Sequence, residues 1–367
     1  MTLIIRQHYL QNNRVIGDII LSDAASLNSL SLDMVRQMHA VLAKWLNMPE
    51  VVAVLLRGDG AHFCAGGNIR DLYQAMEHND WAYVSAFFSE EYHLDYMIHR
   101  YPKPIIGWAT GVTMGGGMGI FQGCGVRAVG GALRLAMPEA QIGIFPDVGA
   151  AWFLRRCPPP LGLFLGMSGA MLNVADAKYA CLADYTLPAD SAEQLLTALQ
   201  NADWCNDNDK NFAVARAALS NLEEIIEESN LAAAASEINA CCHLSSAAAT
   251  YAALLQATHP WLQKTAVKMR NASLAAIMYW HQHWHTQQKA ALAEVFAADY
   301  AAILTFCRHG DFAEGVRALL VDKGYQPTWR GHNDALPQWV SDILPADQTA
   351  ADNLRRELTE KDFSPRF

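Results

Sequence analysis

Two glycine-rich segments hold the residues with the clearest chemical potential. The first is "HFCAGGNIR" (62–70) and the second is "GVTMGGGMG" (111–119). Glycine lets the backbone come close to a ligand and leaves its N–H groups uncovered. Each segment follows an apolar run and precedes a helix-like stretch, and the positive end of a helix attracts negative charge. Two such loops side by side could direct two N–H groups at one oxygen, which is the oxyanion hole of thioester and acyl chemistry.

Other interpretations of these glycines compete with this one. Two adjacent glycines often serve only to pack a tight turn. The second segment also has part of a dinucleotide-binding G-x-G-x-x-G pattern, with Glu139 about 20 residues beyond it. However, Ile120 stands where the last glycine would be, and the segment lies in the third strand–loop unit instead of the first. A serine hydrolase of the α/β-hydrolase type is not indicated, because the sequence has no Gly-x-Ser-x-Gly.

The thirteen histidines could suggest a metal site, above all in "WHQHWH" (280–285). On a helix only His281 and His285 share a face, since positions two residues apart point in different directions. Two histidines without an acidic residue in the same run make a poor metal site. We therefore expect a packed or surface helix here and no metal.

The elements around the glycine segments alternate between strand and helix. Continuous apolar runs predict buried strands at 51–60 and 104–111, and apolar residues at helical spacing predict a helix from Leu32 to Trp45 capped by Ser31. A long aromatic helix is expected at 81–101, where Pro102 and Pro104 end it. Before these elements we expect paired strands within 1–22, with a turn at 11–14. After them we expect a helix that follows the glycine run, and then a strand, a loop and a helix at 129–156. A helical region should extend from about 190 to 320, followed by a loop-rich end with short helices.

Composition and charge indicate a folded protein and argue against one that binds nucleic acid. The chain has 367 residues, 52% hydrophobic and 17% charged, which is typical of a globular protein and not of a disordered one. The repeated order of strand, loop and helix is that of an α/β fold. Its net charge is −10, with 27 basic and 37 acidic residues and no basic cluster, so nucleic-acid binding is not expected. The eight scattered cysteines contain no Cys-x-x-Cys, and we expect them to be reduced thiols.

Two segments of the sequence bear on where the protein is located, the N-terminus and the uncharged stretch at 105–126. The N-terminus has no long apolar run with a small-residue cleavage site, so we expect a cytoplasmic protein. The uncharged stretch 105–126 is long enough to span a membrane, but eight of its 22 residues are glycine. We therefore expect a buried strand, loop and helix there, and no membrane association.

Three ordered motifs, "FCAGGNI", "TMGGGMG" and "AMPEAQIGIFPDVGAAWFL" (136–154), resemble the crotonase (enoyl-CoA hydratase/isomerase) superfamily. The third motif, together with "HGDFAEGVRALLVDKGYQPTW" (309–329), is most similar to its 3-hydroxyisobutyryl-CoA hydrolase branch. The resemblance covers the first 160 residues and the segment near 305–330. It implies an α/β fold, a crotonase-like spiral of ββα units with a helical C-terminal region that helps to close the active site.

The resemblance also implies a division of the chain and a place for the acyl oxygen. The core with the active site would cover 1–190, the helical C-terminal region 191–330, and a tail packing on the core 331–367. The family's oxyanion hole corresponds to the backbone N–H groups of Gly67 and Gly116. The opening glycines would thus let a thioester carbonyl lie against bare backbone.

Acidic residues separate the branches of the superfamily. A hydratase uses two glutamates, and the positions that correspond here are Gly119 and Glu139, so one carboxylate of that pair is absent. Adding water across a double bond needs a second proton-transferring group. The hydrolase branch matches glycine at 119, Glu139, and a further acid at Asp147. Without the resemblance, Glu139 is an acidic turn residue and Asp147 is a helix-starting one.

The hydrolase resemblance assigns the remaining roles. Glu139 would be the catalytic carboxylate, attacking the thioester to form a mixed anhydride or activating water, two routes that stay open. Asp147 would bind the 3-hydroxyl of the substrate, and Glu91 matches a further substrate contact. Arg70 matches a basic position near the phosphates of CoA, and the adenine would lie near the first loop and "LNSLSLDM" (27–34).

Two departures from the family pattern are visible. Asn68 stands where many relatives have Asp, which could alter the hydrogen bonding of the first loop. The Ser-Pro-Thr segment of the branch is replaced by "NASLAAIMYW" (271–280), which is expected to touch the acyl pocket and so to affect the choice of substrate.

The resulting hypothesis is hydrolysis of a short branched 3-hydroxyacyl-CoA, 3-hydroxyisobutyryl-CoA above all, in valine catabolism. CoA enters only as part of the substrate, no metal or redox cofactor is implied, and a homo-oligomer is left open. The alternatives are an enoyl-CoA hydratase or isomerase of the same fold and a non-catalytic CoA-binding protein.

Overall fold

A computed structural model describes residues 3–10, 13–224, 228–322, 324, 326–330 and 348–360. Most of the predicted tail (331–347 and 361–367) and the first half of the predicted turn at 11–14 therefore lie outside the described residues.

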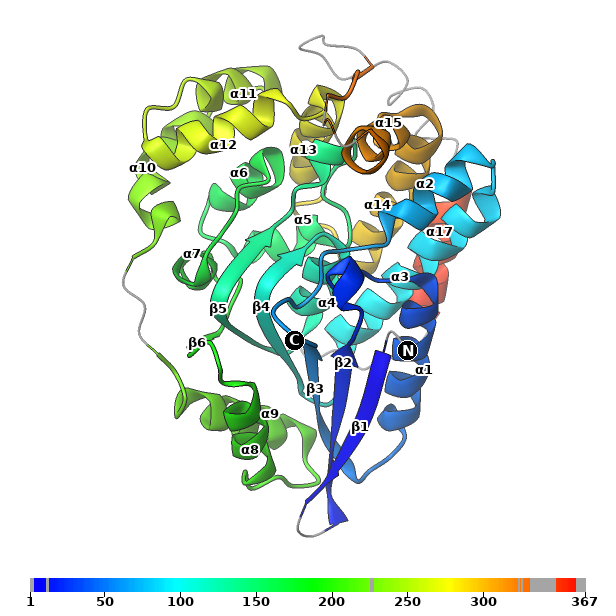
Figure 1. Cartoon of the computed structure of the whole chain (residues 1–367), viewed down its shortest axis with the longest axis vertical. Coiled ribbons are helices and arrows are strands. Elements are labelled where there is room, and N and C mark those ends of the chain that lie inside the picture. Colours follow the sequence, from blue (N-terminus) through cyan, green and yellow to red (C-terminus); the bar gives the residue numbers. More distant parts are fainter. Residues whose placement is uncertain are drawn as a thin grey trace.

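A six-stranded sheet lies at the centre, and its strands follow one another in chain order (Figure 1). Its members are β1 (Leu3–Tyr9), β2 (Val15–Leu21), β3 (Val51–Gly58), β4 (Ile105–Met114), β5 (Val126–Ala136) and β6 (Tyr185–Leu187). β1 pairs antiparallel with β2, and each later pair of neighbours is parallel. Side chains of β2 and most of β3 are buried on both faces, which explains the continuous apolar runs in the sequence.

Helices fill the connections between parallel strands and then form a long C-terminal series. The described α-helices are α1 (Leu32–Leu46), α2 (Ile69–Glu77), α3 (Trp81–Arg100), α4 (Gly116–Gly123), α5 (Ala150–Phe153), α6 (Leu161–Ser168), α7 (Val174–Tyr179), α8 (Ala192–Gln200), α9 (Asn208–Ser220), α10 (Asn230–Cys242), α11 (Ala247–Leu255), α12 (Pro260–Arg270), α13 (Leu274–Thr286), α14 (Leu292–His309), α15 (Phe312–Val316) and α17 (Gln348–Glu360). The fold-class prediction, α/β with a helical C-terminal region, is confirmed.

Local signals in the sequence set several helix ends. The Oγ atom of Ser31 accepts a hydrogen bond from the N–H of Met34 at 3.2 Å, so Ser31 caps α1 as predicted. The side chain of Asp80 caps α3 by accepting from Tyr83, and α3 ends at Arg100, ahead of the two prolines.

The second glycine segment differs from its prediction in two ways. β4 continues to Met114, because Gly111, with φ of 54°, makes an irregular step in the pairing with β5 without ending the strand. The helix then begins at Gly116 itself, whereas the sequence suggested a glycine loop ahead of the helix. The N–H groups of the glycine run are therefore those of a helix N-terminus, which have no acceptor within the helix.

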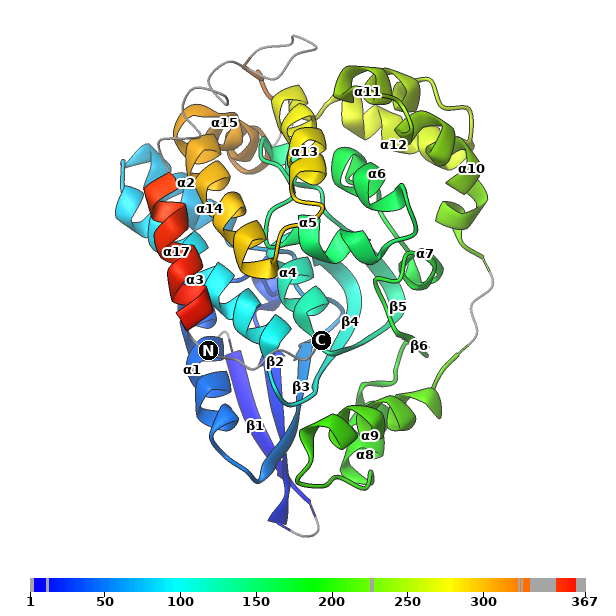
Figure 2. The same ribbon diagram turned by 180° about the vertical axis from the view of Figure 1, so that it is seen from behind.

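Helices cover the two faces of the sheet unequally. One face carries α8 and α9, whose Leu195 and Leu219 pack in a cluster with Ile16, Leu55 and Trp108 of the strands. The larger core lies on the other side and includes side chains of α1, α3, α4, α6, α13 and α14. The two views show α8 and α9 beside the strands and away from the remaining C-terminal helices (Figures 1 and 2).

The last described helix returns to the larger core. α17 packs along α14 and also contacts α3, and Leu354 and Leu358 are buried there (Figure 2). Among the described helices, none combines the length and apolar character that crossing a bilayer requires.

The topology places three predicted motifs together. β3, β4 and β5 are parallel neighbours, so their carboxyl ends lie at one edge of the sheet. The segments with Gly67, Gly116 and Glu139 each follow one of these ends. In α/β proteins this edge is the usual ligand site.

Candidate active site

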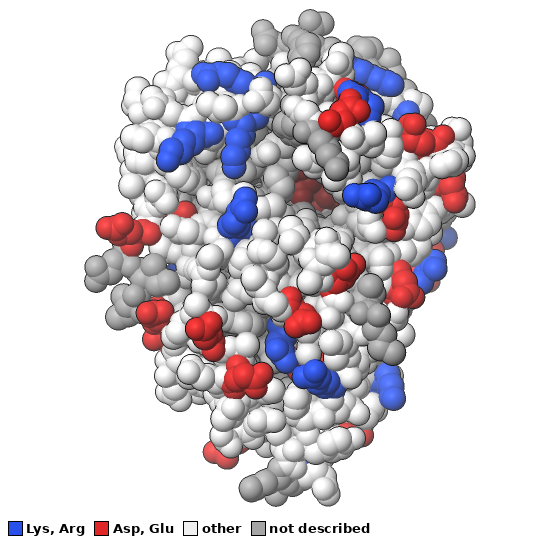
Figure 3. Space-filling view, viewed as in Figure 1, with Lys and Arg blue, Asp and Glu red and all other residues white. Residues whose placement is uncertain are grey.

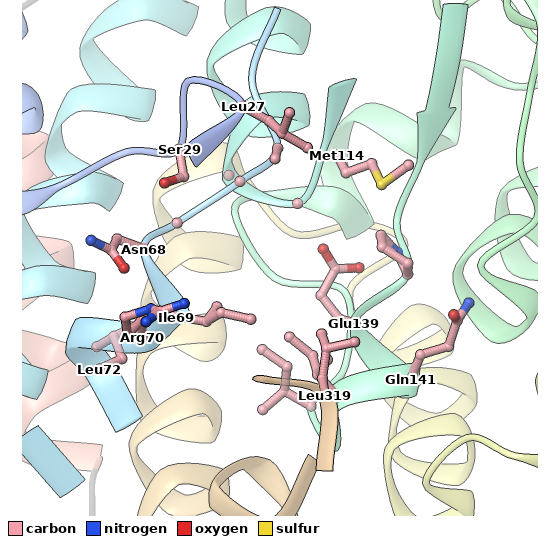
Figure 4. A pocket seen from close by; sticks show the side chains of 18 of the residues that line it. Leu27, Ser29, Asn68, Ile69, Arg70, Leu72, Met114, Glu139, Gln141 and Leu319 are labelled. Atoms are coloured by element: carbon pink, nitrogen blue, oxygen red, sulfur yellow. The ribbon is translucent and has the colours of Figure 1, made fainter. Parts of the chain in front are cut away.

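A cavity of about 760 Å³ opens at this edge, and all six residues singled out from the sequence line it. These residues are Gly67, Arg70, Glu91, Gly116, Glu139 and Asp147. Figure 3 shows acidic atoms at the bottom of a hollow and basic side chains on the surface to either side of it. Figure 4 shows Glu139 near the centre of the cavity, with Asn68, Arg70 and Leu72 on the side opposite Gln141.

Backbone hydrogen bonds hold the two glycine loops against each other. The N–H of Cys64 donates to Val112 O at 3.0 Å, and the N–H of Met114 donates back to Cys64 O at 3.0 Å. On its other side the first loop bonds to residue 30, since Leu30 N–H donates to Gly66 O and Asn68 N–H donates to Leu30 O, each at 2.8 Å. These bonds leave Gly67 between two fixed neighbours.

The backbone of Gly67 and the backbone of Gly116 come close together at the wall of the cavity. A Cβ atom added to Gly116 would lie 3.3 Å from Gly67 N and only 2.2 Å from Glu91 Oε1. Within the described part of the chain, neither N–H donates a hydrogen bond. Among the described residues, both N–H groups are therefore available as donors at the cavity, and the lack of a side chain at 116 leaves room beside Glu91.

Three carboxyl groups surround this space. Glu139, Asp147 and Glu91 are 4%, 5% and 2% exposed. Glu139 lies next to the glycine run, because a Cβ atom added to Gly115 would stand 3.1 Å from Glu139 Oε1. Asp147 Oδ2 accepts a 2.6 Å hydrogen bond from the hydroxyl of Tyr92, whereas neither oxygen of Glu139 has a partner among the described residues.

Burial and mutual repulsion oppose ionisation of these acids. Burial raises the pKa of Glu139 well above its usual value, and the charge of Asp147 raises it further. The pKa of Glu91 is raised well above its usual value by burial and then by Asp147. Burial raises the pKa of Asp147 to about 7, although the hydrogen bond from Tyr92 lowers it. The cavity therefore holds acids that titrate at higher pH than ordinary carboxyl groups.

Position 119 has no room for a side chain. A Cβ atom added to Gly119 would lie 2.7 Å from Asp95 Oδ2 and 2.8 Å from Val148 Cβ. Asp95 is fully buried, has no hydrogen-bond partner among the described residues, and is not one of the residues that line the cavity. The missing second glutamate of a hydratase is thus not replaced at this place by another carboxyl group that reaches the cavity.

Basic side chains lie at both sides of the cavity. Arg70, from α2, is exposed on one side. Arg134 of β5 and Lys268 of α12 also line the cavity, and sequence reasoning did not find them. Burial lowers the pKa of Lys268, and the nearby charge of Arg134 lowers it further. Lys268 is distant in sequence from the motifs, so only the path of the C-terminal helices brings it here.

The first loop and the C-terminal region complete the walls. Asn68 caps α2 by accepting from Asp71 N–H at 3.3 Å, so the departure from Asp keeps an N-cap. Leu27 and Ser29, within the segment expected near the adenine, line the cavity, as does Ser26 just before that segment. The C-terminal side is closed by Phe312, Leu319 and Leu320.

The segment 271–280 does not line the cavity, contrary to expectation. It lies behind Glu139 instead, where the N–H of Ser273 donates to Ala140 O at 2.8 Å and the Ser273 hydroxyl donates to Asp311 at 2.7 Å. The segment therefore supports the turn that carries Glu139.

The histidine run lies on α13 as a helix packed against the core. His281 and His285 share a face, with ring centroids 4.6 Å apart, as the spacing predicted. His283 is buried and its Nε2 atom lies 2.7 Å from Asp299 Oδ1, a partner from another helix that the local sequence could not reveal. In the part of the chain that the structure describes, no three His, Cys, Asp or Glu side chains gather as a metal site.

Comparison with known sequences identifies a family and its relatives. A sequence profile described as "Enoyl-CoA hydratase/isomerase" matches residues 16–342. The chain is 31% identical to "3-hydroxyisobutyryl-CoA hydrolase, mitochondrial" of Xenopus tropicalis, over 92% of this chain and 91% of the relative. Identity to the human protein of the same name is 31%, over 96% and 86%. "3-hydroxyisobutyryl-CoA hydrolase 1" of Arabidopsis thaliana is 28% identical, over 85% and 83%.

Solved structures share the fold. An enoyl-CoA hydratase from Rhodobacter sphaeroides superposes with a TM-score of 0.82 at 29% identity, covering 94% of this chain and 97% of that one. A carnitinyl-CoA dehydratase from Mycobacterium thermoresistibile gives a TM-score of 0.79 at 30% identity, covering 95% of each chain. The crotonase-like architecture expected from the motifs is confirmed.

The buried carboxyl group of Asp95 should make the stability of the folded protein depend on pH. Its pKa is raised well above the usual value by burial and then by Glu91, so the folded protein binds this proton more tightly than the unfolded chain. Stability therefore falls as pH rises from the unfolded pKa, about 3.9, through the higher folded one. Asp95→Asn removes this loss, and we expect it to raise the free energy of unfolding at pH 8 by about 1–3 kcal/mol.

Denaturant unfolding at pH 5 and pH 8 checks this prediction, with a larger gain expected at pH 8. The control is Asp176→Asn, because Asp176 is also buried but accepts hydrogen bonds from Leu231 N–H and the Ser229 hydroxyl, so its loss should destabilise. A destabilised Asp95→Asn protein at pH 8 would contradict the account.

Proposed function

The chain belongs to the enoyl-CoA hydratase/isomerase family, and from this premise we propose that it hydrolyses short branched 3-hydroxyacyl-CoA thioesters. The substrate that fits best is 3-hydroxyisobutyryl-CoA, and the products are CoA and 3-hydroxyisobutyrate. The chain is thus an acyl-CoA thioester hydrolase, in agreement with the names of its curated relatives.

One observation carries the proposal. Two uncovered N–H groups, of Gly67 and Gly116, and the carboxyl of Glu139 line one cavity. A thioester carbonyl oxygen between the two donors would gain hydrogen bonds as negative charge develops on it. Removing one such donor typically costs a factor of about 10²–10³ in kcat.

The carboxylate of Glu139 supports two routes from this arrangement. In one, its oxygen attacks the carbonyl carbon, the C–S bond breaks, CoA leaves as the thiolate, and water then hydrolyses the mixed anhydride. In the other, Glu139 takes a proton from water, whose oxygen attacks the same carbon. Both routes need Glu139 in its ionised form, and both release CoA and the free acid.

Asp147 and Glu91 are proposed substrate contacts. Asp147 Oδ2 accepts from the Tyr92 hydroxyl, and a carboxylate has further acceptor capacity for the 3-hydroxyl of the substrate. Glu91 lies beside Gly116, close to the expected position of the acyl group. Together they would favour acyl groups that carry a hydroxyl.

The space around Gly119 argues against the hydratase alternative. A side chain there would collide with Asp95 and Val148, so the second proton-transferring carboxylate cannot be supplied from that position. The names of the two similar solved structures describe hydratase and dehydratase chemistry, but the curated relatives are hydrolases. A non-catalytic CoA-binding protein would not need a buried Glu139 that lacks a hydrogen-bond partner among the described residues, because such burial costs stability.

The proposal extends to how CoA is bound and to where in metabolism and in the cell the reaction takes place. Arg70 would contact the phosphates of CoA, and the reaction would belong to valine breakdown. We propose no metal or redox cofactor and a cytoplasmic location. Relatives such as the Xenopus tropicalis and human proteins are named mitochondrial, which describes those proteins. Whether the chain forms a homo-oligomer stays open.

Thiol release from a panel of acyl-CoA thioesters tests the function. We expect the unmodified protein to release CoA from 3-hydroxyisobutyryl-CoA, and Glu139→Gln to lose this activity by a factor of about 10³ or more because the carboxylate is gone. Binding of CoA, measured by calorimetry, should change little.

The same panel includes crotonyl-CoA, followed by its loss of absorbance. Faster consumption of crotonyl-CoA than of 3-hydroxyisobutyryl-CoA would overturn the hydrolase assignment. Unchanged hydrolysis by Glu139→Gln would refute the role of that residue, and CoA binding without thiol release from any thioester would favour the binding protein.

Asp147→Asn should affect hydroxylated substrates most. We expect kcat/KM to fall about tenfold more for 3-hydroxyisobutyryl-CoA than for isobutyryl-CoA, the factor for one lost hydrogen bond to a charged group. Since the charge of Asp147 raises the pKa of Glu139, the acidic limb of the isobutyryl-CoA pH profile should also move to lower pH. Equal losses on both substrates, or a limb that moves to higher pH, would count against this role.

A further inference from the structure

The turn after Asp147 has an unusual backbone. Val148 has φ of 50° and Gly149 has φ of 78°, so two successive residues adopt the left-handed region. A β-branched residue such as valine avoids this region, and such strain persists only where the surrounding structure fixes it. Because Val148 lines the cavity and directly follows Asp147, whatever fixes the turn also fixes a substrate-facing carboxyl.

A buried carboxylate on α14 holds this turn. Asp299 Oδ2 accepts a hydrogen bond from the N–H of Gly149 at 2.9 Å, and Asp299 is 0% exposed. Gly149 also packs closely against α14, because a Cβ atom added to it would lie 3.0 Å from the ring of Phe296. The turn therefore has a polar and an apolar contact with the same helix.

The second oxygen of Asp299 is occupied by a histidine from α13. His283 Nε2 lies 2.7 Å from Asp299 Oδ1, and His283 is 3% exposed. The other ring nitrogen faces the hydroxyl of Tyr279 at 3.3 Å, and the two rings stack at 25°. With Nε2–H donating to the carboxylate and Nδ1 accepting from Tyr279, the ring has one fixed orientation.

The side chain of Asp147 is fixed from the same helix. Tyr92, which donates to Asp147 Oδ2, packs its ring against Phe296 and Tyr300 of α14, with centroids 5.6 and 6.3 Å apart. α14 thus supports the main chain after Asp147 and the hydroxyl that holds its carboxyl group. Neither His283 nor Asp299 lines the cavity, so neither touches a bound substrate directly.

We propose that His283 and Asp299 are positioning residues that hold the strained 147–149 turn and thereby aim the carboxyl of Asp147 at the hydroxyl of a 3-hydroxyacyl group. This inference rests on the proposed function of the cavity. It makes the selectivity of the enzyme depend on a contact between the C-terminal helices and the loop that carries Asp147. Disturbing the pair should weaken recognition of the hydroxyl more than thioester cleavage itself.

Steady-state kinetics on 3-hydroxyisobutyryl-CoA and isobutyryl-CoA test the inference. Asp299→Asn cannot accept on both sides, because one of its two groups is now a donor. We expect kcat/KM to fall about tenfold more for the hydroxylated substrate than for the plain one, as for one lost hydrogen bond to a charge. In the Asp147→Asn background the same change should add no further selectivity, since coupled residues are not additive.

A pair of variants at His283 separates positioning from packing. The side chain of His283→Gln keeps an N–H donor for Asp299, whereas that of His283→Leu fills the space without a donor. We expect His283→Gln to retain most of the preference for the hydroxylated substrate and His283→Leu to lose it. Equal behaviour of the two variants would refute a role for the hydrogen bond.

Controls use matched polar groups that do not line the cavity. His8 also pairs with a buried aspartate, Asp18, at 3.2 Å, and Asp176 also accepts main-chain N–H groups. His8→Gln and Asp176→Asn should leave the ratio of the two kcat/KM values unchanged, even if they lower stability. A similar change of ratio in these controls would show that loss of stability alone causes it.

Amide hydrogen exchange gives a readout that does not depend on activity. The N–H of Gly149 should lose protection in Asp299→Asn and His283→Leu and keep it in His283→Gln; unchanged protection in the first two would overturn the inference. Failure of the unmodified protein to hydrolyse 3-hydroxyisobutyryl-CoA would instead refute the proposed function. If the unmodified protein hydrolyses 3-hydroxyisobutyryl-CoA but Asp299→Asn lowers kcat/KM equally for both substrates, only the positioning role would be refuted.

Discussion

The structure depends on the close approach of two backbone segments at the carboxyl edge of the sheet. The backbone nitrogen of Gly67 lies close to Gly116, because a Cβ atom at 116 would stand 3.3 Å from that nitrogen and 2.2 Å from Glu91 Oε1. The hydrogen bonds between Cys64 and residues 112 and 114 set that distance, because they tie the first loop to β4. Parallel pairing of β3 with β4 makes those bonds geometrically available. The backbone itself therefore fixes the two nitrogen atoms that the proposed reaction needs as donors.

The acids impose the second constraint, since burying carboxyl groups together is unfavourable. Glu139 and Glu91 have raised pKa values mainly because they are buried, and the pKa of Asp147 is raised to about 7. A carboxylate that water does not solvate well is a better nucleophile or base toward a carbonyl held by two N–H groups. The neighbouring turn brings Val148 against Gly119, which closes the place where a hydratase would carry its other glutamate. The same packing thus supports hydrolysis and disfavours hydration.

The sequence predicted the strands, the early helices and the six residues that the structure brings to one cavity, because those features are local or belong to ordered motifs. It missed groups that meet only through the path of the C-terminal helices. Lys268 lines the cavity from α12, and His283 finds Asp299 on α14. The acyl-pocket expectation for 271–280 was wrong since Ser273 instead bonds behind Glu139. The glycine run was expected to be a loop, but α4 begins at Gly116. The first N–H groups of a helix have no acceptor within the helix, so they are as uncovered as those of a loop would be.

The most direct test of the account is a crystal structure of the Glu139→Gln protein with 3-hydroxyisobutyryl-CoA bound. The account predicts a thioester oxygen within about 3 Å of the nitrogen atoms of both Gly67 and Gly116. It also predicts the side chain of residue 139 beside the carbonyl carbon. A thioester oxygen that contacts neither nitrogen, or a carbonyl carbon bound away from residue 139, would contradict it.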